Sequence, residues 1–167
     1  LLRDIRMEAL AIRRSVNSRV HPFDFTQVAK MYEETATEIQ TRAASGTFNL
    51  GPVLDRVRDM KAKAETLNGA IVGLSKEKAP VVNDILVETS RILTSTFYTH
   101  AGPFDQDPAY GIPPLPAIQD AAKLAGLDPG SDEAGFLRTR MIRENNKVCK
   151  ALDKASRMIE KATALAG

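Results

Sequence analysis

The sequence predicts an all-α protein: an up-and-down bundle of four-helix type, with a long Pro/Gly-rich loop and a short extra helix before the last long helix. Three observations predict this fold. Apolar residues recur at steps of three and four over most of the 167 residues, which is the spacing of one helix face. Prolines and glycines cluster between these stretches and punctuate them as helix boundaries. No segment alternates apolar and polar residues over the length of a strand.

Residues 1–20 are predicted to form the first helix. Its apolar stripe consists of Leu2, Ile5, Ala9, Ile12 and Val16. Pro22 ends the pattern, because the residue before a proline avoids the helical region. The chain starts inside this pattern without an initiator Met, and we therefore expect a piece of a longer protein. We expect this helix to pack on the bundle formed by residues 21–167.

Three further helices are predicted between residues 24 and 97. The first begins at Asp24, a favoured N-cap, and is expected to end at Gly46 in a left-handed C-cap. The next two begin near Pro52 and Pro80, since proline suits the first turn of a helix. The stripe of the last of them is predicted to comprise Val81, Ile85, Thr89, Ile92 and Thr96.

The second half of the chain begins with the long loop, residues 99–116, which is rich in proline and glycine. Its apolar side chains argue against disorder, so we expect an ordered loop packed on its own protein or on a partner. A short helix follows over residues 117–125. Ser131 is predicted to cap the last long helix, and Asn145 falls on the apolar stripe of that helix. A polar residue in such a place often fixes register or oligomeric state.

Charge and hydropathy exclude several functions. The net charge of +2 comes from 23 basic and 21 acidic residues, so the electrostatic footprint of a nucleic-acid-binding domain is missing. The nearest candidate for a basic stripe consists of Arg138, Arg140, Arg143 and Lys147, and Glu144 interrupts it. No apolar run approaches the ~20 residues of a membrane span. We expect neither nucleic acid nor a membrane as a partner, and the sequence does not indicate a compartment.

The sequence also offers no catalytic or metal-binding constellation. His21 and His100 are its only histidines, and neither has another ligand type at a metal-binding spacing. Cys149, the single cysteine, is expected to be a buried small hydrophobe. Glu33, Glu34 and Glu38 resemble paired carboxylates but are expected to form a solvated helix face. We therefore predict no catalytic residue, no metal ligand and no cofactor in this chain.

A set of short motifs gives a resemblance. The stretch from His21 to Ala29, His-Pro-Phe-Asp-Phe-Thr-Gln-Val-Ala, resembles the Leu-Pro-Phe-Asp junction of the glutamate carboxypeptidase and transferrin-receptor family. Similar segments follow in the family's order, and they are Asn83-Asp84, Phe97-Tyr98-Thr99-His100, Ala101-Gly102-Pro103, Tyr110-Gly111 and Leu115 to Ala121. The resemblance covers essentially the whole chain. Each motif alone is unspecific, and their order and spacing carry the likeness.

The resemblance implies that this chain belongs to a larger protein in which another domain carries the catalytic residues. In this family the junction joins a peptidase domain to a C-terminal helical dimerisation domain. Residues 1–20 would then be the last helix of the peptidase domain, and residues 21–167 the dimerisation domain. The two zinc ions and the catalytic Glu of the family lie in the peptidase domain, so this chain would be non-catalytic. Its partners would be a second copy, in a homodimer, and the peptidase domain of the same chain.

The resemblance also implies that the long loop contributes to the substrate pocket of the full-length protein. In the carboxypeptidases of the family, the matching loop carries a Lys-Tyr pair that holds the terminal glutamate of the substrate. Tyr110 matches the Tyr, whereas Ala109 stands in place of the Lys. Loss of a charge-assisted contact to a carboxylate removes a strong anchor, which leaves a carboxypeptidase or an aminopeptidase as the parent. An aromatic residue in a Pro-rich loop also often packs the loop down, so both roles of Tyr110 stay open.

Two alternatives remain beside this zinc-dependent exopeptidase. One is the dimerisation or scaffold domain of a receptor-like protein whose peptidase domain is inactive. The zinc ligands of the upstream part would separate these two. The other is a free-standing helical ligand-binding bundle, which would need a polar cluster in its core. Asn145, Asn83 and Thr89 are the candidates for such a cluster.

Overall fold

The protein is all-helical throughout the part of the chain that the computed structural model describes, residues 1–44, 46–97 and 112–167. The elements in order are α1 (Leu2–Asn17), α2 (Phe25–Arg42), α3 (Gly51–Ala70), α4 (Ala79–Phe97), the 3₁₀ helix η1 (Pro116–Gly126) and α5 (Asp132–Ala166). The predicted fold class, an all-α helical bundle, is confirmed. The short extra helix before the last long one is present as η1. Most of the long loop lies outside the described residues.

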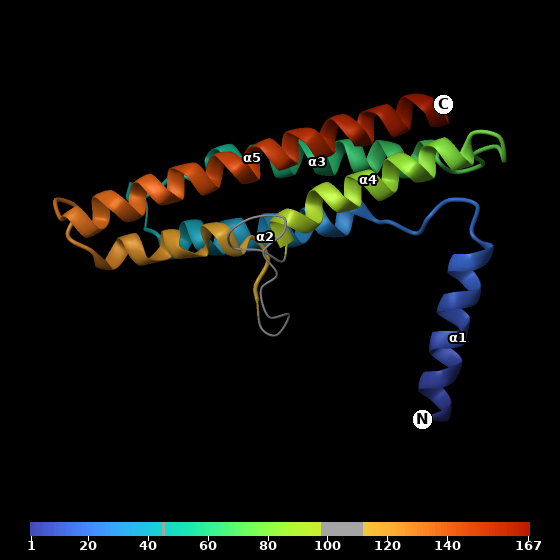
Figure 1. The fold of residues 1–167 in the computed structure, drawn as a ribbon, viewed down its shortest axis with the longest axis horizontal. Helices are drawn as coiled ribbons and strands as arrows, with labels where there is room; N and C mark the ends of the chain where they lie inside the picture. Colours follow the sequence, from blue (N-terminus) through green and yellow to red (C-terminus); the bar gives the residue numbers. More distant parts are fainter. Residues whose placement is uncertain (45, 98–111) are drawn as a thin grey trace.

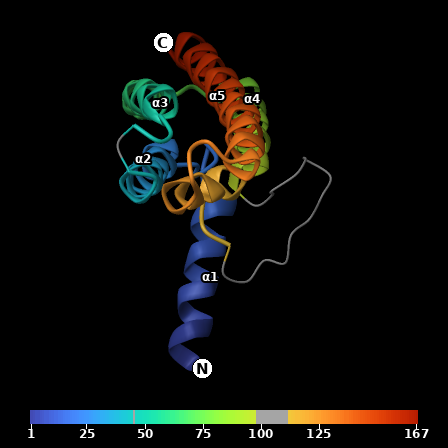
Figure 2. The same ribbon diagram turned by 90° about the vertical axis from the view of Figure 1, so that its left-hand side faces the viewer.

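Four helices share one core (Figures 1 and 2). The 35-residue α5 packs along both α3 and α4, while α2 packs along α3. The short η1 packs mainly against α5 and α2 and touches α4. It continues the bundle beyond the end of α4. The largest fully buried side chains come from every layer of this core and include Tyr32, Leu50, Met60, Leu86, Ile118, Met141 and Leu152.

Helix starts follow the sequence closely. The carboxylate of Asp24 accepts a 3.0 Å hydrogen bond from the backbone N–H of Thr26, and Ser131 Oγ accepts one of 3.2 Å from Ala134. Each satisfies a backbone N–H group that has no partner inside its helix. Pro52 occupies the first turn of α3 and Pro80 that of α4, as predicted.

Two details of the sequence prediction are wrong. The first is the end of α2. That helix ends at Arg42, and Ala44 (φ 58°) takes the left-handed position expected of Gly46, which itself has φ 95° in the connection that follows. The second is Val81, which is 53% exposed while Val82 is fully buried. The stripe of α4 is shifted by one residue at its start, because the buried face of the helix runs through Val82, Leu86 and Leu93.

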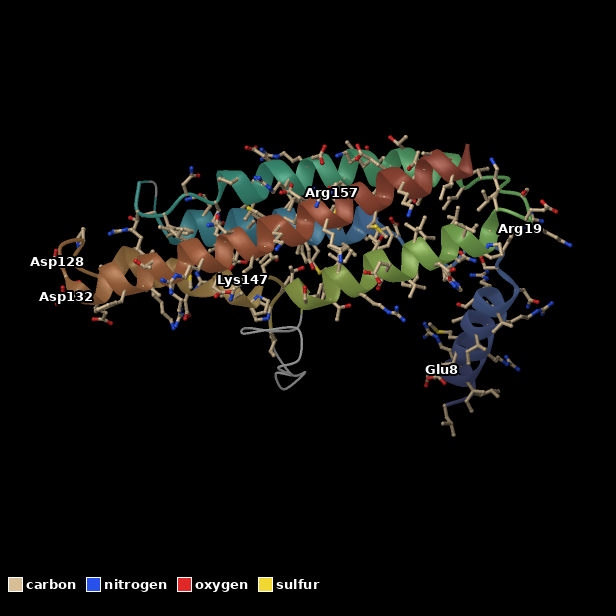
Figure 3. All side chains as sticks on the ribbon, turned by 45° about the horizontal axis from the view of Figure 1, so that its top comes forward. Glu8, Arg19, Asp128, Asp132, Lys147 and Arg157 are labelled. Carbon is tan, nitrogen blue, oxygen red and sulfur yellow. The ribbon has the colours of Figure 1, made fainter. Side chains whose placement is uncertain are left out.

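The third correction concerns α1. It was expected to pack on the bundle, yet none of its residues is buried and it does not approach another helix. It extends away from the bundle at the end where α2 begins (Figure 1), and its side chains stand clear of the other helices (Figure 3). The periodicity correctly predicts the helix, but no other helix among the described residues covers its stripe.

Candidate functional site

The apolar stripe of α1 is the most prominent exposed surface of the described residues. Twelve large apolar side chains are exposed, and seven of them lie in residues 1–16. Those on the predicted stripe are Leu2, Ile5, Ile12 and Val16, which are 53–78% exposed. The other five lie singly on the bundle, which is ordinary for a soluble surface. The stripe runs along a helix about 24 Å long, and a contiguous exposed apolar surface is typical of a site where another molecule packs.

The segment between α1 and α2 is fixed to the bundle. The backbone N–H of His21 donates to Asn83 Oδ1 over 2.8 Å, and Asn83 Nδ2 donates to the carbonyl of Arg19 over 3.0 Å. The Arg19 guanidinium in turn donates to the carbonyl of Leu74 over 2.6 Å. These bonds tie the segment to the start of α4 and to the α3–α4 turn. The point from which α1 projects is therefore held by the bundle.

A small apolar groove lies beside this junction, between α2 and the end of α4. It has a volume of about 310 Å³ and is lined by Phe23, Phe25, Val28, Met31, Leu93 and Phe97 among others. Phe23 and Phe25 stack with their ring centroids 5.9 Å apart. Below the groove, Tyr32 is fully buried, and its hydroxyl lies 2.8 Å from Thr96 Oγ1. The groove adjoins the point where the described part of α4 ends.

The one sequence-predicted site residue cannot be placed. Tyr110 and its neighbour Ala109 lie outside the described residues, as does His100. The suggested contribution of Tyr110 to a substrate pocket therefore stays a prediction. Of the two histidines only His21 is placed; it is exposed and makes an edge-on ring contact with Phe23.

The remaining candidates for chemistry have structural partners. Glu33 lies 3.0 Å from the guanidinium of Arg58 on α3, and Glu38 lies 3.6 Å from Arg42. Two of the three acidic residues of α2, Glu33 and Glu38, therefore form surface ion pairs. Cys149 is buried, and this burial raises the pKa of its thiol, which disfavours the reactive thiolate. Within residues 1–44, 46–97 and 112–167, no group of His, Cys, Asp and Glu side chains could hold a metal ion.

A larger pocket lies at the other end of the bundle, about 990 Å³ in volume, between the α2–α3 connection and the first half of α5. Its lining includes Gln40, Phe48, Arg138, Ile142 and Asn145. Sequence reasoning marked Asn145 as a polar residue on an apolar stripe but did not find the pocket. The other residues come from segments about a hundred positions apart, and only the packing of α5 against the α2–α3 connection brings them together.

Comparisons with known proteins give no family for this chain: no family model, no curated protein and no solved structure matches it. None of the helices in the described ranges has the length and apolar character that crossing a membrane requires.

Proposed function

We propose that this chain is a non-catalytic helical dimerisation domain of a glutamate carboxypeptidase-like zinc metallopeptidase, and that it contributes a loop to the substrate pocket of the full-length enzyme. The observation that carries the proposal is α1, whose apolar stripe has no cover within the described residues. Burial of apolar surface is the main driving force of association. The stripe therefore favours packing against a second folded unit, which for this last helix of the peptidase domain is that domain in the full-length protein and a second copy in the present chain alone.

Two features support the proposal. The stripe belongs to a helix whose base is fixed by the Asn83 hydrogen bonds, so a partner bound to α1 would be positioned relative to the bundle. The described residues also offer no group of His, Cys, Asp and Glu side chains that could hold a metal ion, and the single cysteine is buried. Zinc and the catalytic chemistry belong, in this proposal, to the peptidase domain that the resemblance implies.

Sedimentation velocity tests the proposal. We expect the chain to sediment as a dimer at micromolar concentration, because its stripe is free to pair with that of a second copy. Replacing Ile5 and Ile12 by Glu places two charges in the stripe and should give a monomer, without a change in the unfolding free energy of the bundle. A chain that is monomeric up to several hundred micromolar contradicts the proposal.

Met7→Glu is the matched control. Met7 is 59% exposed, close to the 53% of Ile5 and the 64% of Ile12. It is two residues from Ile5, a rotation of about 200° around the helix, and so lies on the opposite face. The substitution adds one negative charge, where the stripe variant carries two, to the same helix and leaves the stripe intact. We expect this variant to remain a dimer; if it dissociates as the stripe variant does, charge and not the stripe governs association.

A further inference from the structure

The pocket between the α2–α3 connection and α5 contains a polar group that no described residue satisfies. Asn145 is only 8% exposed, and its side-chain oxygen is buried without a hydrogen-bond partner among the described residues. A buried amide without a partner costs free energy, and such groups are rare in folded proteins. The residue nevertheless lines a pocket that a ligand can enter. The oxygen itself is covered by the protein, so the part of the carboxamide that a bound molecule can reach is Nδ2, which makes no hydrogen bond with a described residue.

A cation lies on the same side of α5. Arg138 is half-buried, lines the pocket, and makes no ion pair or hydrogen bond with a described residue. Its neighbours Arg140 and Lys147 pair instead with Asp120 and Glu144. Arg138 and Asn145 are seven residues apart, which places them two helical turns and about 10 Å apart along α5. Ile142 lies between them and faces the same pocket.

The opposite wall is held in place. Gln40 Nε2 donates to the carbonyl of Phe48 over 2.8 Å, and Gln40 Oε1 accepts from the backbone N–H of Leu50 over 2.7 Å. The side chain of Gln40 thus fixes the connection that carries Phe48 and Asn49 into the pocket lining. Both ends of this amide are occupied, which leaves Arg138 and Asn145 as the polar groups on α5 that are free to bind.

The geometry points to a binding site for the carboxyl-terminal end of a short, extended peptide. Arg138 pairs with the terminal carboxylate, which its planar guanidinium suits. Ile142 and Phe48 contact the side chain of the C-terminal residue, and Asn145 Nδ2 donates to a peptide carbonyl that precedes it in the peptide. Extended chain rises ~3.3 Å per residue, so the 10 Å between the two polar groups corresponds to about three residues. The site is independent of the dimerisation proposed above.

Calorimetric titration of the chain with acetyl-trialanine, and with the same peptide as its C-terminal amide, tests this site. We expect the free acid to bind at least about tenfold more tightly, because the amide lacks the charge that Arg138 pairs with. Arg138→Gln should remove that difference between the two peptides. Arg143→Gln is the matched control: this arginine is exposed on the same helix and does not line the pocket. It should bind as the unaltered chain does.

Asn145→Leu separates binding from structure. Replacing an unsatisfied buried amide by an apolar group of similar shape is neutral or stabilising, so the midpoint of urea unfolding should stay or rise while binding of the free acid weakens about tenfold or more. Asn146→Leu, at the exposed neighbouring position, should leave binding unchanged. The proposal is overturned if neither peptide binds at millimolar concentration, if acid and amide bind equally, or if Asn145→Leu lowers the unfolding midpoint and keeps the binding.

Discussion

The backbone N–H of His21 donates a 2.8 Å hydrogen bond to the side-chain oxygen of Asn83, a residue 62 positions later in the chain. The side-chain nitrogen of Asn83 donates to the carbonyl of Arg19. One side chain at the start of α4 thus holds both sides of the bend between α1 and α2. This contact links two of the segments on which the family resemblance rests, the junction and Asn83-Asp84. In physical terms it is a non-covalent cross-link, a pair of hydrogen bonds that joins the start of α4 to the connection between α1 and α2.

The first prediction concerns this cross-link. Asn83→Ala removes both hydrogen bonds and should lower the free energy of unfolding by about 1–3 kcal/mol, since each such bond contributes ~0.5–1.5 kcal/mol. It should also increase the rate of proteolysis within residues 18–24, because that segment loses its attachment. Urea unfolding and limited proteolysis measure the two effects. Arg91→Ala, at an exposed position of the same helix, should change stability by less than ~0.5 kcal/mol.

The second prediction concerns the buried hydroxyl of Tyr32. It lies 2.8 Å from Thr96 Oγ1 and donates to the carbonyl of Leu93 over 3.2 Å, both on α4. The backbones of α2 and α4 do not approach one another closely, so this hydroxyl spans the gap between them. A double-mutant cycle with Tyr32→Phe and Thr96→Val should give a coupling energy of about 1 kcal/mol. Additive effects of the two substitutions would show that the contact contributes nothing.

The sequence predicts the bundle well because helical periodicity is a local property. Phe25, Ala29, Tyr32, Ala36 and Ile39 recur at steps of three and four and are all buried on one face of α2. The caps Asp24 and Ser131 are equally local. The packing of α1 was not predictable in the same way. Its stripe has the same spacing as those of the bundle helices, and spacing alone does not tell which surface covers a stripe.

The pocket could be predicted only in part. Asn145 stands out in the sequence as a polar residue among the apolar positions of α5, and its unsatisfied amide agrees with that signal. The sequence does not distinguish Arg138 from the arginines near it. Only the structure shows that Arg140 forms an ion pair while Arg138 forms none with a described residue. The wall built by Gln40 and Phe48 depends on tertiary packing between segments distant in sequence. Sequence patterns of one chain carry no such information.

The third prediction concerns pH. A hydrogen bond from the Thr26 hydroxyl, followed by one from the Thr26 backbone N–H, lowers the pKa of Asp24 in the folded chain. Its stabilising contribution is therefore complete above the unfolded-state pKa of about 4 and is lost as the pH falls below that value. Asp24→Asn keeps a good N-cap but does not titrate. Urea midpoints at pH 7 and pH 3 should differ less in this variant than in the unaltered chain. An equal difference would contradict the assignment.

The fourth prediction concerns Ser156, which is 3% exposed and whose hydroxyl has no hydrogen-bond partner among the described residues. Ser156→Ala removes a desolvated hydroxyl and introduces the residue with the highest helix propensity. We expect the free energy of unfolding to rise by about 0.5–1 kcal/mol, against the usual outcome of substitution in a core.

Ser95→Ala is the matched comparison for this effect. Ser95 lies on α4, and its hydroxyl donates to the carbonyl of Ile92 over 2.8 Å. Both variants gain the same helix propensity, but only Ser95→Ala loses a hydrogen bond. Urea unfolding should therefore rank Ser156→Ala above Ser95→Ala by about 1 kcal/mol. The reverse order, or a loss of stability in Ser156→Ala, would mean that the hydroxyl of Ser156 is satisfied in solution, by a buried water or by a rotation of its side chain toward a backbone carbonyl of α5.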